Sequence, residues 1–291
     1  MIYYAGMKYT NSLNLGDHIQ SLAVEQFLPR VSARFERDKL RNSKDKSIKY
    51  LLVANGWFSH TPEQCFPFSP HITPLFFGFH ITNWNKSLKY IENKNVIDFF
   101  INNSPIGCRD KHTEYSLKKW GVDAYFTNCM TLSFPNREYM PPRTKYFLVD
   151  VPAHLKIPDR ILSKSQYITH SCRNSSEIAN FETAKSLIAH YRKEASAVIT
   201  TRLHCALPCL AMGIPVLFIG NENDIRIGNL LEIRVKINHP DELSEKSKWD
   251  DLFYKDFDFL EQVKRKMIAD FKERLMAVEN KYANDLSQLL F

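Results

Sequence analysis

Short apolar runs of strand length alternate with helical patterns along most of this chain. The runs that predict strands in the first half are Ile2–Ala5, Lys49–Ala54, Leu75–Phe79, Pro105–Cys108 and Ala124–Thr127. Those in the second half are Tyr146–Val151, Gln166–Ser171, Ala197–Thr201, Val216–Ile219 and Arg234–Ile237. The segments between them carry apolar residues at three- and four-residue spacing, which predicts helices, most clearly over Glu177–Lys193. Strands that alternate with helices indicate the α/β class.

The alternation falls into two arrays with a proline-bearing junction between them. Asn136 to Arg143, with prolines at 135, 141 and 142, is the linker candidate. We therefore predict two Rossmann-like domains facing a cleft, over residues 1–140 and 141–291. The tail from Trp249 to Phe291 reads as one long helical pattern. It suits a helix that packs back on both halves better than a coiled coil or a membrane-surface helix.

Composition and net charge limit the classes of molecule that the chain is expected to bind. The chain of 291 residues is 44% hydrophobic and has a formal net charge of +7 with a pI near 9.0. A positive balance favours anionic partners such as phosphorylated donors or lipid headgroups. Nucleic acid is disfavoured because the basic residues are scattered and no binding motif appears.

Expectations about cellular location and cofactors follow from features that the sequence lacks. No apolar run reaches transmembrane length, and the first residues, MIYYAGMKYT, read as a strand and not as a signal peptide. The six cysteines include no Cys-x-x-Cys pair and read as reduced thiols. We expect a cytoplasmic protein, with peripheral contact at the inner face of the membrane left open. No metal or cofactor is expected, because no carboxylates or histidines cluster at ligand spacing.

The most informative stretch is Glu194–Gly220, EASAVITTRLHCALPCLAMGIPVLFIG. It reads as a strand, a turn, a small-residue helix ended by Gly213, and a second strand. Arg202 and His204 fall in the turn where the first strand gives way to the helix. Unpaired N–H groups at a helix N-terminus attract anions, and a guanidinium fork suits phosphate or carboxylate. His204 adds a group that can donate a hydrogen bond or a proton near neutral pH. The pattern therefore predicts an anion site.

Other polar residues follow predicted strands at the same edge. Asn14-Leu15-Gly16-Asp17 reads either as a turn with Asp17 capping a helix or as a loop at the ligand edge. Gly56 follows the strand Lys49–Ala54. Arg109 is either an anion ligand or a partner of Asp110 or of the sheet edge. His170 lies at the end of the strand Gln166–Ser171, and His80 reads as a polar strand end.

The segment ITTRLHCALPCLAMGIPVLF resembles the signature of the polysaccharide pyruvyl transferases, with its Arg-Leu-His triplet and Gly-x-Pro-Val strand. The resemblance extends to Asn14-Leu15-Gly16-Asp17 and to Gly107-Cys108-Arg109-Asp110. It implies two domains similar to the B-type glycosyltransferase fold. It also implies transfer of pyruvate from phosphoenolpyruvate onto two sugar hydroxyls as a cyclic ketal, with release of phosphate. The acceptor would be a glycan or lipid-linked oligosaccharide of a capsule or exopolysaccharide.

On this resemblance we assign roles as expectations. Donor binding falls to Arg202, Leu203, His204 and Arg226. Cleft or acceptor contacts fall to Asn14, Gly16, Gly56 and Arg109. For proton transfer we expect His204 at the donor phosphate and Asp17 as base, with His170 as the alternative. Two rival functions stay open: a glycosyltransferase with a nucleotide-sugar donor, and a non-catalytic anion-binding module.

Overall fold

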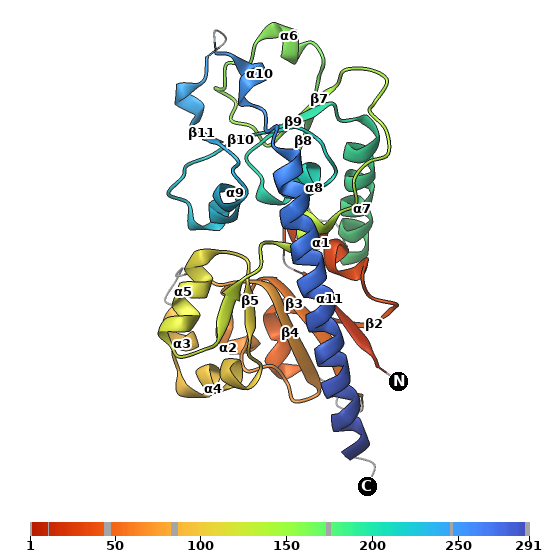
Figure 1. The fold of residues 1–291 in the computed structure, drawn as a ribbon, viewed down its shortest axis with the longest axis vertical. Coiled ribbons are helices and arrows are strands. Elements are labelled where there is room, and N and C mark those ends of the chain that lie inside the picture. The colour runs from red at the N-terminus through yellow and green to blue at the C-terminus, as the bar shows by residue number, and fades with distance from the viewer. Residues whose placement is uncertain are drawn as a thin grey trace. The chain divides into compact units, whose positions relative to one another are not determined.

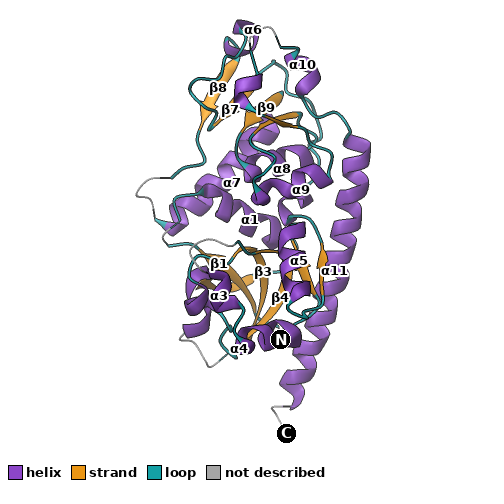
Figure 2. Cartoon of the chain, turned by 90° about the vertical axis from the view of Figure 1, so that its left-hand side faces the viewer, coloured by secondary structure: helices purple, strands orange, loops and turns teal. Residues whose placement is uncertain are grey.

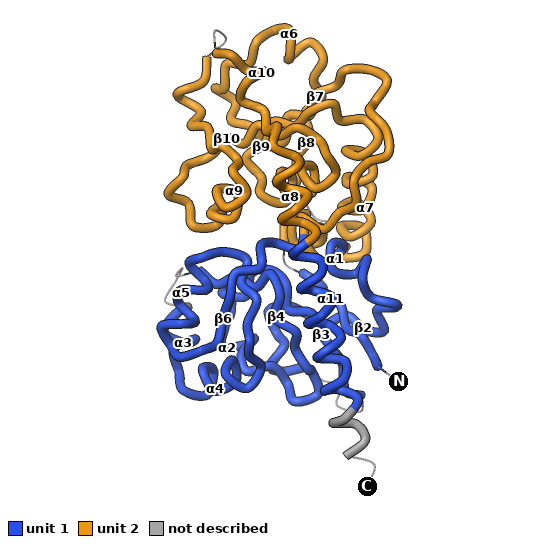
Figure 3. The backbone as a smooth tube through the Cα atoms, viewed as in Figure 1, with its two compact units in different colours: residues 1–11, 21–130, 266–291 blue, residues 12–20, 131–265 orange. Residues whose placement is uncertain are grey.

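A computed structural model describes residues 2–10, 12–43, 48–82, 87–172, 176–244 and 247–288. The chain divides into two compact units, which are coloured separately in Figure 3. Unit 1 comprises residues 1–11, 21–130 and 266–291, and unit 2 comprises residues 12–20 and 131–265. The sequence-based boundary at residues 140 and 141 falls inside unit 2, ten residues after the crossing at 130 and 131.

Unit 1 is built on a six-stranded parallel sheet in the order β2-β1-β3-β4-β5-β6 (Figure 1). Its strands are β1 (Tyr4–Lys8), β2 (Val31–Glu36), β3 (Tyr50–Trp57), β4 (Ile72–His80), β5 (Ile106–Cys108) and β6 (Ala124–Phe126). Its helices are α1 (Leu15–Glu25), α2 (Pro62–Cys65), α3 (Ser87–Ile91), α4 (Lys94–Asn102) and α5 (Lys111–Lys119), with the 3-10 helix η1 (Arg37–Asn42). The first residues of α1 belong to unit 2, as does most of the 3-10 helix η3 (Met130–Ser133). Phenylalanines fill much of its core: Phe58, Phe66, Phe68, Phe76, Phe79 and Phe100.

Unit 2 is built on a five-stranded parallel sheet in the order β11-β10-β9-β7-β8. Its strands are β7 (Tyr146–Val149), β8 (Ser165–Ile168), β9 (Ala197–Thr200), β10 (Val216–Ile219) and β11 (Ile237–Asn238). Its helices are α6 (Asp159–Leu162), α7 (Glu177–Glu194), α8 (Leu203–Ala211), α9 (Gly228–Glu232) and α10 (Trp249–Leu252), with η4 (Ile225–Ile227) and η5 (Pro240–Glu242). Figure 2 shows helices packed around the strands of each unit.

Parallel strands need crossover connections, and their carboxyl ends therefore gather at one edge of each sheet, where ligands bind in open α/β folds. The prediction of an α/β chain with two Rossmann-like halves is confirmed. That the halves face a common cleft stays a prediction. Among the described residues, no helix is both long and apolar enough to cross a membrane.

The tail departs from the predicted single helix. Helix α10 ends at Leu252, and α11 begins only at Phe257 and runs to Gln288. Phe253 in the gap is extended, and the Tyr254 N–H donates to the Val216 carbonyl over 2.9 Å, so the backbone leaves the helix to bond to β10. Both aromatic side chains are buried in unit 2. Residues of α11 contribute to both cores: Leu260 is buried in unit 2, and Phe271 packs on Phe27 and Phe77 in unit 1.

Candidate anion site in unit 2

The Arg-Leu-His turn lies where the sequence predicts it. Strand β9 is fully buried between β10 and β7, and α8 begins at Leu203 directly after it. Arg202 is the N-cap residue of α8, and its backbone N–H donates to Thr200 Oγ1 over 2.9 Å. The first turn of this nine-residue helix therefore directs its N–H groups toward the carboxyl edge of the sheet.

Two side chains hold the guanidinium of Arg202. Its Nε donates to Asp150 Oδ2 over 2.7 Å, and its Nη2 donates to Ser171 Oγ over 3.2 Å. The Arg202 side chain keeps 38% of its surface exposed, so it is accessible as well as oriented. Burial alone would raise the pKa of Asp150, but hydrogen bonds from Thr169, the His170 backbone and Arg202 outweigh it and lower that pKa. The Arg202 guanidinium is thus paired with the Asp150 carboxylate.

The segment around Asn14 belongs to unit 2 and docks beside this turn. Asn14 and Ser171 form an antiparallel bridge, and the Leu15 N–H donates to the His170 carbonyl over 2.8 Å. A methyl group added to Gly16 would lie 2.9 Å from Nδ1 of His204, closer than real Cβ contacts allow. The structure therefore brings Asn14, Gly16 and His204 together, and Arg202 joins them through Ser171.

Asp17 is not the N-cap of α1. The helix begins at Leu15, and Asn14 Oδ1 accepts the Gly16 N–H over 3.1 Å, so Asn14 performs the capping expected of Asp17. Asp17 lies in the first helical turn, only 9% exposed, and Ser12 Oγ donates to its Oδ2 over 2.6 Å. Its carboxylate is held in place near the site, and its role as a base stays a prediction.

His170 has its backbone at the site and its ring inside unit 2. The residue is 1% exposed, and its Nε2 lies 2.8 Å from the hydroxyl of Tyr191. The two rings stack with centroids 6.0 Å apart. Burial raises the pKa of the Tyr191 hydroxyl, which therefore stays protonated beside the imidazole. The geometry favours a supporting role for His170, since its backbone carries the contacts to Leu15 and Asp150.

Arg226 and Leu203 complete the predicted donor set. Arg226 lies in η4 and its guanidinium forms a two-pronged ion pair with Asp224, whose Oδ2 accepts from Nη2 at 2.5 Å. The hydrogen bonds that Arg226 donates to Asp224 raise the pKa of Arg226. Leu203 is the first residue of α8 and is partly exposed.

The two other predicted residues belong to unit 1. Gly56 lies near the carboxyl end of β3 with φ of 119°, which only glycine adopts readily, and a register shift interrupts the β3–β4 pairing beside it. Arg109 follows β5, is buried, and donates its backbone N–H to the Phe79 carbonyl over 2.8 Å. Asp110 pairs with His80, with 2.5 Å between His80 Nδ1 and Asp110 Oδ2, and also caps α5. His80 is the last residue of β4, as expected of a polar strand end, and it is also paired with Asp110.

The profile of one protein family, described as polysaccharide pyruvyl transferase, matches residues 14–223 of the chain. The chain belongs to the polysaccharide pyruvyl transferase family. The match runs from Asn14 through the Arg-Leu-His turn, and Arg226 lies just beyond its end. No curated protein matches the chain. A solved structure of a functionally uncharacterised protein from Klebsiella pneumoniae is similar at 15% identity and a TM-score of 0.49, over 79% of this chain and 88% of that one.

Membership in this family makes the chain a transferase that acts on polysaccharide. Asp150 and Ser171, which hold the Arg202 guanidinium, are not among the residues predicted from the sequence. Ser171 ends a predicted strand and Asp150 lies one residue before the end of another, and this position is the signal that could have found them. They were overlooked because a carboxylate and a hydroxyl do not by themselves suggest an anion site.

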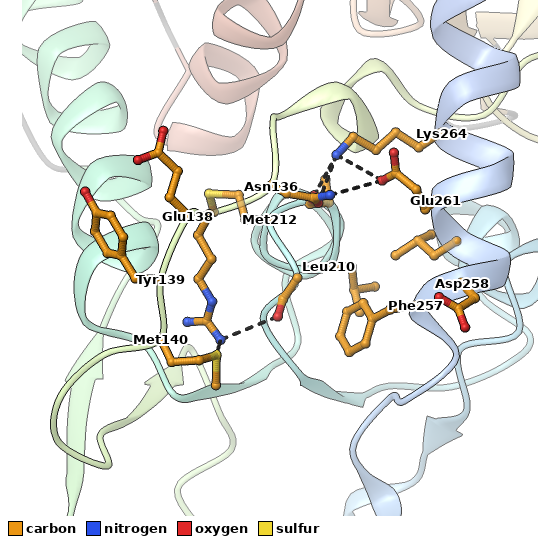
Figure 4. A pocket seen from close by; sticks show the side chains of 14 residues that line it. Asn136, Glu138, Tyr139, Met140, Leu210, Met212, Phe257, Asp258, Glu261 and Lys264 are labelled. Carbon is orange, nitrogen blue, oxygen red and sulfur yellow. Dashed lines mark hydrogen bonds and ion pairs between the residues drawn. The ribbon is translucent and has the colours of Figure 1, made fainter.

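A pocket of about 400 Å³ opens elsewhere in unit 2, at the opposite end of α8 (Figure 4). It is lined by residues 136–140, 210–213, 257, 258, 260, 261 and 264. Lys264 points to Asn136 in Figure 4, and its Nζ donates to Asn136 Oδ1 over 3.1 Å and to the Ala211 carbonyl over 2.9 Å. Lys264 therefore caps the C-terminal end of α8, where a cation is favourable. None of the predicted site residues lines this pocket.

Proposed function

We propose that the protein transfers pyruvate from phosphoenolpyruvate to a sugar of a cell-surface glycan or its lipid-linked precursor, as a cyclic ketal, and releases phosphate. The observation that supports this most is the oriented and accessible Arg202 at the N-terminus of α8, with His204 one residue into the helix. Phosphoenolpyruvate carries a carboxylate and a phosphate close together, and this arrangement offers a planar fork and helix N–H groups to them.

The reaction requires one proton at carbon and two hydroxyl additions. Protonation of the methylene carbon of phosphoenolpyruvate generates an oxocarbenium-like centre at C2, which one sugar hydroxyl attacks. A second hydroxyl of the same sugar then displaces phosphate from C2 and closes the ketal. The two hydroxyl protons leave as the bonds to C2 form, so a base is needed there. The departing phosphate is stabilised by cationic and hydrogen-bond donors.

The residues of unit 2 supply groups for donor binding, for protonation of the departing phosphate and for deprotonation of an acceptor hydroxyl. Arg202 and the first N–H groups of α8 bind the phosphorylated acid. His204 contacts the donor phosphate and protonates it as it leaves. Asp17, held by Ser12, accepts a proton from an acceptor hydroxyl. His170 holds the loop that carries Leu15.

A glycan acceptor accords with the family, and a lipid-diphosphate carrier would accord with the net charge of +7. Such a carrier would place the enzyme at the inner face of a membrane. Gly56 and Arg109 at the carboxyl edge of unit 1 are proposed for the acceptor.

The test is incubation of the protein with phosphoenolpyruvate and a panel of lipid-linked and free galactosides and N-acetylmannosaminides, followed by mass spectrometry and a phosphate assay. We expect acceptor-dependent phosphate release and a product that has gained one pyruvate ketal. A parallel thermal-shift series compares phosphoenolpyruvate with uridine diphosphate sugars. Stabilisation by the nucleotide sugars alone, with glycosyl transfer to the same acceptors, would contradict the proposal.

A further inference from the structure

Asp150 lies at a point that the sheet of unit 2 determines. Strand β7 pairs with β9 on one side and β8 on the other, and Val149 lies opposite both Thr200 and Ile168. The residue after Val149 therefore lies beside the β9–α8 turn and also beside the loop that follows β8. Asp150 has this position because it directly follows β7, the strand that lies between β8 and β9.

The carboxylate of Asp150 joins those two segments through one oxygen. Its Oδ2 accepts Arg202 Nε over 2.7 Å and the His170 N–H over 2.9 Å. The His170 carbonyl in turn accepts the Leu15 N–H over 2.8 Å, at the start of α1. One carboxylate thus connects the arginine of the Arg-Leu-His turn, through His170, to the segment that carries Gly16 and Asp17.

The backbone of Asp150 is held in an uncommon conformation. Its φ is 49°, in the left-handed region that aspartate and asparagine enter more readily than other residues with a Cβ. Its N–H donates to the Ile168 carbonyl over 3.1 Å, and its carbonyl accepts Thr201 Oγ1 over 2.9 Å. Neighbours on both sides therefore fix this conformation, as expected for strain that persists at a functional site.

We propose that Asp150 is the positioning residue of the donor site. It fixes the Arg202 guanidinium by Nε, and Nη2 donates to Ser171, which leaves Nη1 and the second N–H of Nη2 to meet the anion. It also holds the loop on which the Asn14–Asp17 segment docks. An arginine ordered before the ligand arrives loses less conformational entropy on binding, which raises affinity without a direct contact. The kinetic test of this role depends on the proposed use of phosphoenolpyruvate, whereas the structural test does not.

The kinetic test compares Asp150→Asn, Asp150→Ala and Asp150→Gly with the wild-type protein. Asparagine keeps an acceptor oxygen and tolerates the positive φ, whereas glycine relieves the φ and removes the acceptor. We expect KM for phosphoenolpyruvate to rise ~tenfold or more in both Asp150→Ala and Asp150→Gly, and Asp150→Asn to recover most of it. Asp250→Ala is the matched control, because it removes an exposed arginine–aspartate pair with Arg160 in the same unit. It should leave KM unchanged.

A second readout needs no substrate. Hydrogen exchange of peptides that cover residues 12–18 and 165–172 reports the Leu15 and His170 amides. Exchange should accelerate in Asp150→Ala and Asp150→Gly, and stay near wild type in Asp150→Asn and Asp250→Ala. If the wild-type protein does not use phosphoenolpyruvate, the proposed function fails. The exchange result then tests the positioning role of Asp150 by itself. Three results would each overturn the positioning role. The first is exchange in Asp150→Ala and Asp150→Gly that matches the wild-type protein, and the second is an unchanged KM in both of these variants. The third is Asp150→Asn as impaired as Asp150→Ala.

Discussion

Gly16 leaves room for His204: a methyl group on Gly16 would come within 2.9 Å of the imidazole Nδ1. Glycine inside a helix costs stability relative to alanine, so its presence in the first turn of α1 needs a reason. Contact between the α1 start and the α8 start supplies that reason. The two segments are far apart in sequence, and both belong to unit 2.

The first prediction follows from this contact. Gly16→Ala should displace the imidazole of His204, and turnover should fall ~tenfold or more, as small misplacements of catalytic groups can cause. Stability should change little, because the higher helix propensity of alanine, about 1 kcal/mol, offsets the crowding. Steady-state kinetics and thermal unfolding measure the two effects. Gly228→Ala is the control, since it begins α9 with no atom within 4 Å of the added methyl. Equal activity in both variants would contradict the role of this contact.

The second prediction distinguishes the proposed general acid, His204, from the proposed general base, Asp17. His204→Gln keeps a hydrogen-bond donor but cannot transfer a proton, and Asp17→Asn keeps the shape of the carboxylate without its charge. Each should lower kcat by ~10²–10³-fold, with a smaller effect on KM. The pH–rate profile of the wild-type enzyme should be bell-shaped, and each variant should lose a different limb. Both variants retaining both limbs would show that proton transfer lies elsewhere.

The third prediction concerns the buried His80–Asp110 pair of unit 1. Burial, with the charge of Arg109, lowers the pKa of His80 to about 4 despite the opposing hydrogen bond to Asp110. In the unfolded chain an imidazole titrates near ~6.5, so between these values the unfolded state binds a proton that the folded state does not. Stability should therefore fall by about 3 kcal/mol as pH drops from about 6.5 to about 4.

Urea unfolding at several pH values tests this. His80→Gln should lose most of that pH dependence, whereas His154→Gln, which alters an exposed histidine of unit 2, should keep it. Parallel pH curves for the wild-type protein and His80→Gln would contradict the assignment.

The central part of unit 2 could be predicted from the sequence because its elements are locally consistent. Strand β10 and the start of α8 have the bounds that β-branched runs, Gly213 and Pro215 indicate. The first polar residues after buried strands, Arg202 among them, were recognisable by position alone. The α/β class followed from the same alternation.

Strand β2 was missed because it is an edge strand. Val31, Ala33 and Phe35 alternate with polar residues, which is a strand pattern, but two of those polar residues, Arg34 and Glu36, are charged. Arg34 is satisfied by a two-pronged pair with Glu25, with 2.7 and 2.6 Å between the atoms, which only the folded chain reveals. Edge strands tolerate such charges.

The membership of residues 12–20 in unit 2 could not be predicted either. It depends on backbone hydrogen bonds between segments about 155 residues apart, Leu15 with His170 and Cys172 with Leu13. No local pattern encodes such pairings. The same holds for the Asp150–Arg202 ion pair, which arises from the register of β7 and β9.

The most direct test of the central claim is calorimetric titration of phosphoenolpyruvate into the wild-type protein and into Arg202→Ala, with Arg160→Ala as control for loss of an exposed arginine. We predict that wild type and Arg160→Ala bind alike, and that Arg202→Ala binds ~tenfold or more weakly, because it loses charge-assisted hydrogen bonds to the donor. Equal affinity of Arg202→Ala and the wild-type protein would contradict the assignment of the donor site to the Arg-Leu-His turn.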